Sequence, residues 1–268
     1  MPNEESNKVT NTDDITHLSD AELLRYSRQI MLPKFDVAGQ LSLLNSKVLI
    51  IGMGGLGSPV SMYLAAAGVG CLYLADDDRV DVSNLQRQVI HRESSVAQLK
   101  VDSAAQTLED INPHIQVKKY PARLSGEALA SAVRGVDLVL DCSDNFETRF
   151  EINRACVTHR KPLVSGAAIR MEGQISVFDN RVPESPCYQC LFPEGLDDAL
   201  SCSESGVMAP LVGIIGSMQA MEAIKIISGL GQNLSGRLLL LDAMTMDWRS
   251  LKLKRDANCP CCSVKSSI

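Results

Sequence analysis

Residues 47–57, with the sequence KVLIIGMGGLG, indicate how this chain folds. The first five residues form an apolar run, which is typical of a strand buried on both faces of a sheet. The next six hold a glycine turn of the GxGxxG type, and small residues over 58–67 predict a helix after it. A strand, a glycine turn and a helix in this order are typical of a Rossmann-type phosphate site. We therefore expect a nucleotide to bind at the turn glycines Gly52, Gly54, Gly55 and Gly57.

Strand and helix patterns alternate along the rest of the chain. Short apolar runs predict strands at 71–75, 115–120, 136–141, 162–167 and 174–178. Helical patterns cover 100–112 and 207–228, the second ended by Gly229, and antiparallel strands are predicted at 238–242 and 250–253. This order predicts an α/β fold, with a Rossmann-like, mostly parallel sheet, helices on both faces and an antiparallel C-terminal portion.

The chain divides into a short tail and one domain. Residues 1–17 are polar and predict a disordered tail. Residues 18–268 are expected to form a single domain, with a nucleotide-binding part over 18–160 and a second part over 161–268. Ser19 and Glu22 have the spacing of a capping box, so a helix is predicted to begin there and to stop before Pro33.

Composition excludes several classes of protein. The net charge of −6 argues against nonspecific binding of nucleic acid, which needs a basic surface. No run of about 18 uninterrupted apolar residues predicts a membrane span, and the N-terminus lacks the apolar core of a secretory signal. Nine cysteines without such a signal favour a reducing, cytoplasmic location, with metal ligands and free thiols rather than disulfides.

Polar residues after the second strand suggest a site for a phosphorylated nucleotide. Asp76 ends that strand, where an acidic residue can bind ribose hydroxyls. Asn84, Arg87 and Lys100 follow and could hold a triphosphate. The alternatives are a glycine turn used only for packing and a solvated loop with ordinary ion pairs. The turn by itself does not distinguish ATP from NAD.

Asp144 follows the strand at 136–141, at the sheet edge where ligands bind in open α/β folds. A carboxylate in this position can hold Mg²⁺ that bridges phosphate oxygens. The alternative is that Ser143 or Asp144 caps the next helix.

Two Cys-x-x-Cys pairs, Cys187/Cys190 and Cys259/Cys262, predict a structural zinc site with four thiolates. Each pair alone could instead be redox-active, and the long separation means that the fold must bring the pairs together. Cys261 is interpreted as a bystander. Cys202 lies in an aperiodic stretch over 191–206, where a loop thiol could be a nucleophile or an ordinary free cysteine.

The motifs together resemble the ubiquitin-activating-enzyme-like adenylyltransferases of the MoeB/ThiF type. The resemblance covers about 18–262 and includes both cysteine pairs. Its other motifs are LRYSRQI at 24–30, the glycine turn, SNLQRQ at 83–88, DCSDN at 141–145, VSGAAIRMEGQ at 164–174 and GVMAPL at 206–211.

The resemblance implies roles for matching residues. Asp76 would bind the ribose of ATP, Gly55 would lie against the nucleotide, and Asn84, Arg87 and Lys100 would contact phosphates. Asp144 would hold Mg²⁺ and act as the main catalytic acidic residue. Arg28 resembles an arginine that reaches the neighbouring subunit's site, which implies a homodimer. The matched zinc ligands are Cys187, Cys190, Cys259 and Cys262.

The implied reaction is ATP-dependent adenylation of the C-terminal Gly-Gly carboxylate of a ubiquitin-like sulfur carrier. The motifs are most similar to those of members that act on the small subunit of molybdopterin synthase, in molybdenum cofactor biosynthesis. Some relatives carry an appended rhodanese domain, whereas this sequence ends six residues after Cys262, so a separate sulfur donor is expected. Alternatives are adenylation of the thiamin-pathway carrier, an NAD(P)-linked oxidoreductase and an inactive scaffold.

Overall fold

The computed structural model describes residues 15–194 and 205–263. Its centre is the strand β1 (Lys47–Ile51), which pairs in parallel with β2 (Cys71–Ala75) on one side and with β4 (Leu138–Asp141) on the other. The parallel part is completed by β3 (Gln116–Tyr120) beside β2 and by β5 (Pro162–Ile169) beside β4. The apolar run at 47–51 is therefore a central strand, as predicted.

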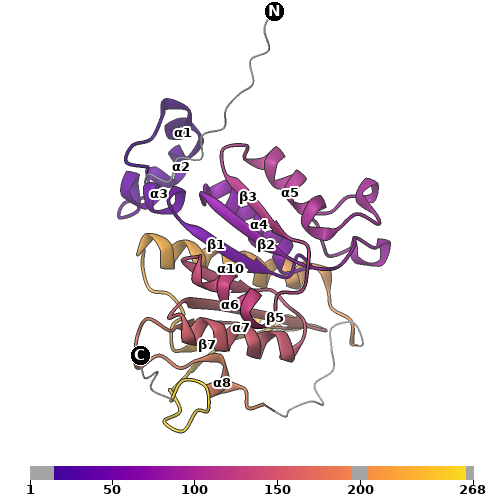
Figure 1. Ribbon diagram of the computed structural model, residues 1–268, viewed down its shortest axis with the longest axis vertical. Helices are drawn as coiled ribbons and strands as arrows, with labels where there is room; N and C mark the ends of the chain where they lie inside the picture. Colours follow the sequence, from indigo (N-terminus) through magenta and orange to yellow (C-terminus); the bar gives the residue numbers. More distant parts are fainter. Residues whose placement is uncertain (1–14, 195–204, 264–268) are drawn as a thin grey trace, which may run out of the picture.

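Three antiparallel strands extend the same sheet beyond β5. They are β6 (Glu172–Asp179), β7 (Arg237–Asp242) and β8 (Asp247–Lys252). The strand order is β3-β2-β1-β4-β5-β6-β7-β8, so β3 and β8 are the two edge strands. Figure 1 shows β3 and β7 well apart in the sheet. The predicted fold class, a mostly parallel sheet with an antiparallel C-terminal portion, is confirmed.

Alternate residues of β1 enter two separate cores. Val48 and Ile50 belong to one apolar cluster and Leu49 and Ile51 to the other, which explains why the strand is apolar at successive positions. The first cluster is covered by α3 (Asp36–Leu44), α4 (Gly57–Ala67), α5 (Lys100–Ile111) and α10 (Ala209–Ser228). The second is covered by α6 (Gly126–Arg134) and α7 (Phe146–Thr158). Helices therefore lie on both faces, as predicted.

The predicted first helix is two short helices, α1 (Asp20–Arg25) and α2 (Ser27–Ile30). The Ser19 capping box is confirmed, but the helix breaks at Tyr26. The Tyr26 ring is 1% exposed, and its hydroxyl accepts a hydrogen bond from Asn112 Nδ2 at 2.9 Å. Burial of this ring fixes the break, which local periodicity does not reveal. Of the predicted tail, Ile15 exchanges two hydrogen bonds with Asn45, and residues 1–14 lie outside the described part of the chain.

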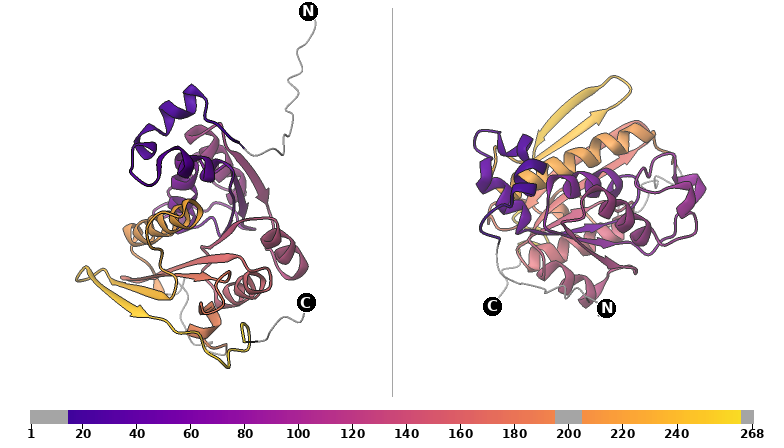
Figure 2. Two further views of the ribbon diagram at one scale, coloured as in Figure 1. Left: turned by 90° about the vertical axis from the view of Figure 1, so that its left-hand side faces the viewer. Right: turned by 90° about the horizontal axis from the view of Figure 1, so that it is seen from above.

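The helix α10 begins two residues later than predicted and ends at Gly229, whose φ of 69° makes it the expected left-handed cap. It is long and apolar enough to cross a membrane by length and composition, and half of it is buried inside the protein. It packs on α3, α4, β5 and β6, so its apolar character belongs to the core. The strands β7 and β8 form a hairpin that projects from the body, and every residue of β8 is exposed (Figure 2).

Close packing between α4 and α10 generates a stability prediction. A Cβ atom at Gly216 would lie 2.5 Å from the Leu56 carbonyl oxygen and 2.5 Å from Pro59 Cγ. We expect Gly216→Ala to lower the free energy of unfolding by about 1–3 kcal/mol, because neither the backbone nor a proline ring can move aside easily. The change is measured by urea unfolding.

Gly213→Ala is the matched control, since it lies on the same helix and its Cβ would meet no atom within 4 Å. This change should leave stability equal or higher, because alanine favours a helix by about 1 kcal/mol over glycine. Equal losses in the two variants would contradict the packing explanation.

Candidate functional site

The glycine turn lies where the carboxyl ends of β1 and β4 meet. Gly52 has a φ of 95°, and a Cβ there would lie 2.6 Å from the Cys142 carbonyl oxygen. A Cβ on Gly57 would lie 2.0 Å from the Gly52 carbonyl oxygen, and one on Gly55 would lie 2.9 Å from Val212 Cγ2. Gly52 and Gly57 need glycine because neighbouring backbone lies against them, and Gly55 leaves room for the Val212 side chain. Gly54 has more room, with its nearest neighbour at 3.5 Å.

Asp76 fastens the glycine turn to the end of β2. Its Oδ2 accepts a hydrogen bond from the Met53 backbone N–H at 2.7 Å, and its Oδ1 accepts one from the Asp78 N–H at 2.8 Å. Burial raises the pKa of Asp76 above its usual value, and this outweighs the opposing effects of Lys100 and the two N–H groups. The carboxyl group is therefore held in place before any ligand arrives.

A pocket of about 310 Å³ brings together four of the sequence-predicted site residues. Gly52, Asp76, Lys100 and Asp144 line it, from the ends of β1, β2 and β4 and the start of α5. Parallel strands present their carboxyl ends at one edge of a sheet, so residues distant in the sequence converge there. Of the residues predicted to bind the nucleotide or its phosphates, those that do not line this pocket are Gly54, Gly55, Gly57, Asn84, Arg87 and Arg28.

The side chains predicted to bind phosphates already make contacts within the protein. The Lys100 ammonium lies 2.8 Å from Asp78 Oδ2, with the lysine side chain 7% exposed and the aspartate 68% exposed. Arg87 Nη1 donates to the Ser83 carbonyl at 3.2 Å, and Asn84 Oδ1 accepts from Gln88 Nε2 at 2.7 Å. Lys100 therefore forms an ion pair of the kind that the solvated-loop alternative predicts.

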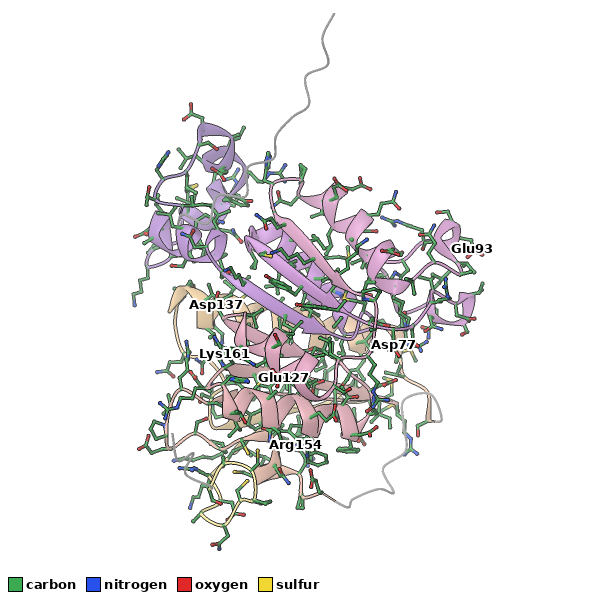
Figure 3. The ribbon with its side chains drawn as sticks, viewed as in Figure 1. Asp77, Glu93, Glu127, Asp137, Arg154 and Lys161 are labelled. Carbon is green, nitrogen blue, oxygen red and sulfur yellow. The ribbon has the colours of Figure 1, made fainter. Side chains whose placement is uncertain are left out.

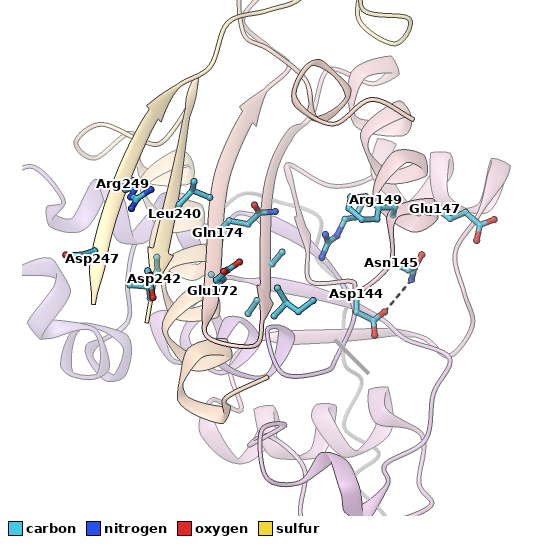
Figure 4. A pocket seen from close by; sticks show the side chains of 16 residues that line it. Asp144, Asn145, Glu147, Arg149, Glu172, Gln174, Leu240, Asp242, Asp247 and Arg249 are labelled. Atoms are coloured by element: carbon cyan, nitrogen blue, oxygen red, sulfur yellow. Dashed lines mark hydrogen bonds between the residues drawn. The ribbon is translucent and has the colours of Figure 1, made fainter. Parts of the chain in front are cut away.

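Asp144 lies between β4 and α7. Asn145 caps α7, because its side chain accepts a hydrogen bond from the Thr148 N–H at 2.9 Å. The alternative that Ser143 or Asp144 caps this helix is therefore wrong. The exposed Asp144 carboxylate accepts only a long contact from Asn145 Nδ2, at 3.5 Å, among the hydrogen bonds of the described chain (Figure 4). Its oxygens remain accessible to a cation or substrate.

A second pocket, of about 590 Å³, shares Asp144 and Asn145 with the first. It lies between the first turns of α7 and the strands β5 to β8 (Figure 4). Its charged lining residues include Arg149, Glu172, Asp242, Asp247 and Arg249. The motifs at 141–145 and 164–174 supply part of this lining, but the sequence did not predict the pocket, because its other wall comes from β7, β8 and the first turn of α7, which carry no motif.

The sequence analysis also missed a buried network beneath Asp144. Asp141 is 1% exposed and accepts hydrogen bonds from the Ser143 N–H at 3.0 Å and from Ser165 Oγ at 2.8 Å. Arg149 Nη2 donates to the Ser143 carbonyl at 2.8 Å. The sequence does carry a signal for this network, because Asp141 is a charged residue at the end of a buried strand and such a residue needs polar partners. The network holds the chain in place just before Asp144.

The fold brings the two cysteine pairs into one cluster. The Sγ atoms of Cys187, Cys190, Cys259 and Cys262 all lie within 4.8 Å of one another. Nearest distances are 3.6 Å for Cys187–Cys259, 3.5 Å for Cys190–Cys262 and 3.9 Å for Cys187–Cys190. A tetrahedral zinc ion with bonds of about 2.3 Å separates its sulfurs by about 3.8 Å, so the cluster fits zinc.

Two further predicted residues lie apart from these sites. Arg28 is exposed on α2 and lines a separate pocket of about 440 Å³ with residues of α4 and α10, among them Tyr63 and Met221. Cys202 lies outside the described residues.

Comparison with known proteins identifies relatives over nearly the whole chain. Residues 26–261 match the ThiF family. The molybdopterin-synthase adenylyltransferase of Salmonella typhimurium is 52% identical over 248 residues, 92% of this chain and 99% of the relative. The sulfur carrier protein ThiS adenylyltransferase of Escherichia coli is 46% identical, over 91% of this chain and 97% of its own length. A solved structure of E. coli MccB with MccA-N7isoASN has a TM-score of 0.80 at 23% identity, covering 92% of this chain and 75% of that one, and therefore shares the fold.

The cysteine geometry predicts the effect of removing one thiol. Cys190→Ser should reduce bound zinc to well below one ion per chain and lower thermal stability, because three thiolates and a hydroxyl bind zinc more weakly than four thiolates. Metal analysis of the purified protein and a thermal melt measure both effects. Cys71→Ser is the control, since Cys71 is buried in β2 away from the cluster, and it should keep its zinc. A fully metallated, stable Cys190→Ser protein would refute the ligand assignment.

Proposed function

The chain belongs to the ThiF family, and on this premise we propose that it adenylates a ubiquitin-like sulfur carrier. The substrate in this proposal is the small subunit of molybdopterin synthase, and the pathway is molybdenum cofactor biosynthesis. The observation that carries the proposal is the pair of pockets joined at Asp144. One has the residues for a nucleotide, and the other has the size and the mixed apolar and charged lining for a peptide end.

ATP occupies the smaller pocket in this proposal. Asp76 binds the ribose hydroxyls, and the glycine turn with Gly55 lies against the nucleotide. Asn84, Arg87 and Lys100 contact the phosphates, which requires Lys100 to exchange Asp78 for a phosphate oxygen. That exchange is supported by the exposure of Asp78, which returns to water at small cost when its partner moves.

The reacting group of the carrier is its C-terminal carboxylate. Such a group has a pKa of about 3.5 and is ionised at pH 7, so the reaction needs no general base. The difficulty is repulsion between this anion and the phosphates. Lys100 and Arg87 offset the repulsion, and Mg²⁺ held by Asp144 would supply further neutralisation of the phosphate oxygens. The products are an acyl-adenylate and pyrophosphate.

The carrier's Gly-Gly end enters through the larger pocket. Asp144 lines both pockets, so a chain that runs along β5 and β6 reaches the nucleotide beside Asp144. Only a chain without side chains passes close to the nucleotide, which accounts for the two glycines. The part of the chain over 161–268 therefore binds the carrier and zinc, and the part over 18–160 binds the nucleotide, within one domain.

Other parts of the proposal concern assembly and location. The enzyme is a homodimer in which Arg28 reaches the phosphates of the neighbouring site, as suggested by its position outside both pockets of its own chain. A separate donor protein supplies sulfur, because relatives matched over nearly their whole length are named for adenylyl transfer alone. We place the enzyme in the cytoplasm, where ATP is available and thiols stay reduced. Cys202, outside the described residues, would be the loop thiol that bonds to the carrier if the reaction follows the thiamin-pathway alternative.

The second candidate is the thiamin-pathway carrier. It is favoured by the 46% identity to the ThiS adenylyltransferase, against 52% for the molybdopterin-synthase enzymes. Both candidates use the same chemistry and differ only in the carrier that is bound.

The test of function is carrier-dependent exchange between ATP and pyrophosphate. The small subunit of molybdopterin synthase should support exchange, and its form lacking the final glycine should not. The thiamin carrier should support little exchange, and exchange mainly with this carrier would assign the enzyme to the thiamin pathway.

Asp144→Asn should reduce exchange by about 100-fold or more while keeping the fold, because the neutral amide lacks the negative charge that would hold Mg²⁺. Turnover of this variant at the wild-type rate would contradict the magnesium role.

Shared sites predict complementation between two inactive variants. Arg28→Ala and Asp144→Ala homodimers should each be inactive. After subunit exchange at equal concentrations, about half of the dimers are mixed, and each holds one complete site, so about a quarter of wild-type activity should return. Mixed dimers confirmed by mass spectrometry but without activity would exclude action of Arg28 across the interface.

A further inference from the structure

Asn153 links α7 to the cysteine cluster. Its side chain is fully buried on the helix that also carries Arg149 one turn earlier. We propose that Asn153 is a positioning residue of the four-cysteine site, which fixes Cys187 through hydrogen bonds to its sulfur and to the next residue. This inference rests on the zinc site proposed above and deepens it.

The hydrogen bonds of Asn153 account for every polar atom of its amide. Nδ2 donates to Cys187 Sγ at 3.6 Å and to Cys261 Sγ at 3.3 Å. Oδ1 accepts from the Tyr188 backbone N–H at 2.9 Å. An inverted amide would place its NH₂ group against the Tyr188 N–H, so these contacts fix which atom is oxygen and which is nitrogen.

This arrangement holds Cys187 from two directions. Cys187 begins the short helix α8 (Tyr188–Leu191), and the bond to the Tyr188 N–H fixes the start of that helix. The bond to Sγ fixes the direction of the side chain toward Cys259, 3.6 Å away. A donor aimed at a ligand sulfur also offsets part of the negative charge that four thiolates bring together.

Packing around α8 makes α7 a firm support for this contact. The Tyr188 ring lies edge-on to Phe150 of α7 and to Phe178 of β6, with centroids 5.6 Å and 5.8 Å away. Arg154, on the outer side of α7 near α8, pairs with Glu194 at 2.6 Å (Figure 3). Asn153 is therefore held in a rigid frame and can orient Cys187 rather than follow it.

The test is the rate of zinc loss from the purified holoprotein to a chromophoric chelator. Asn153→Asp keeps an acceptor for the Tyr188 N–H but replaces the donor that faces sulfur with an anion. Zinc affinity should fall 10- to 100-fold, with a matching faster release. Cobalt-substituted protein should show shifted thiolate-to-metal charge-transfer bands, which a general loss of stability would not produce.

Asn112→Asp is the matched control. Asn112 is also fully buried, and its amide donates to Tyr26 Oη and to the Ala65 carbonyl, away from the cysteines. This change should lower the melting temperature without altering zinc release or the cobalt spectrum. Asn153→Ala introduces no buried charge and should also release zinc faster, so it decides the question if the aspartate variant does not fold.

The outcomes separate this inference from the zinc assignment. Wild-type protein without stoichiometric zinc, or a Cys190→Ser variant with normal zinc, would refute the zinc site itself. Stoichiometric zinc in wild type, lost in Cys190→Ser but released at the wild-type rate from both Asn153 variants, would overturn the role of Asn153 alone.

Discussion

The close approach of β1 and β4 at their carboxyl ends is the constraint on which the rest of the site depends. Gly52 adopts a left-handed conformation directly against the Cys142 carbonyl, and Gly57 packs against Gly52. No side chain fits between these segments, so the turn and the start of α7 meet at one edge of the sheet. Asp76 then ties the turn to β2, which fixes one side of the pocket that Gly52, Asp76 and Asp144 line.

The helix α7 connects the pocket residues around Asp144 with the four-cysteine cluster. Asn145 begins it beside Asp144, Arg149 holds the Ser143 carbonyl above the buried Asp141, and Asn153 contacts the cysteine cluster. Arg149 and Asn153 are four residues apart, so they lie on the same face of the helix. The cysteine cluster that contacts Asn153 is therefore linked through α7 to the pocket at the start of this helix.

Local patterns predicted the sheet well, and the helices less completely. Apolar runs placed β1, β2, β4 and β5, because burial on both faces selects such residues at successive positions. No helical pattern predicted α3 or α6, and α7 entered only as the helix that Ser143 or Asp144 would cap. The predicted first helix joined α1 to α2 across Tyr26. At the break, the Tyr26 ring is buried and its hydroxyl contacts Asn112, far along the chain, and periodicity does not register such a contact.

The sequence by itself determined the α/β class, the glycine turn, the helix caps at Ser19 and Gly229 and the residue types of the site. These are local properties, set by strand burial, backbone freedom at glycine and short-range hydrogen bonds. Only the tertiary structure decided that Asp144 lies between two pockets and that four distant cysteines form one cluster. These depend on how separate elements pack, and packing is settled by contacts between residues far apart in the chain.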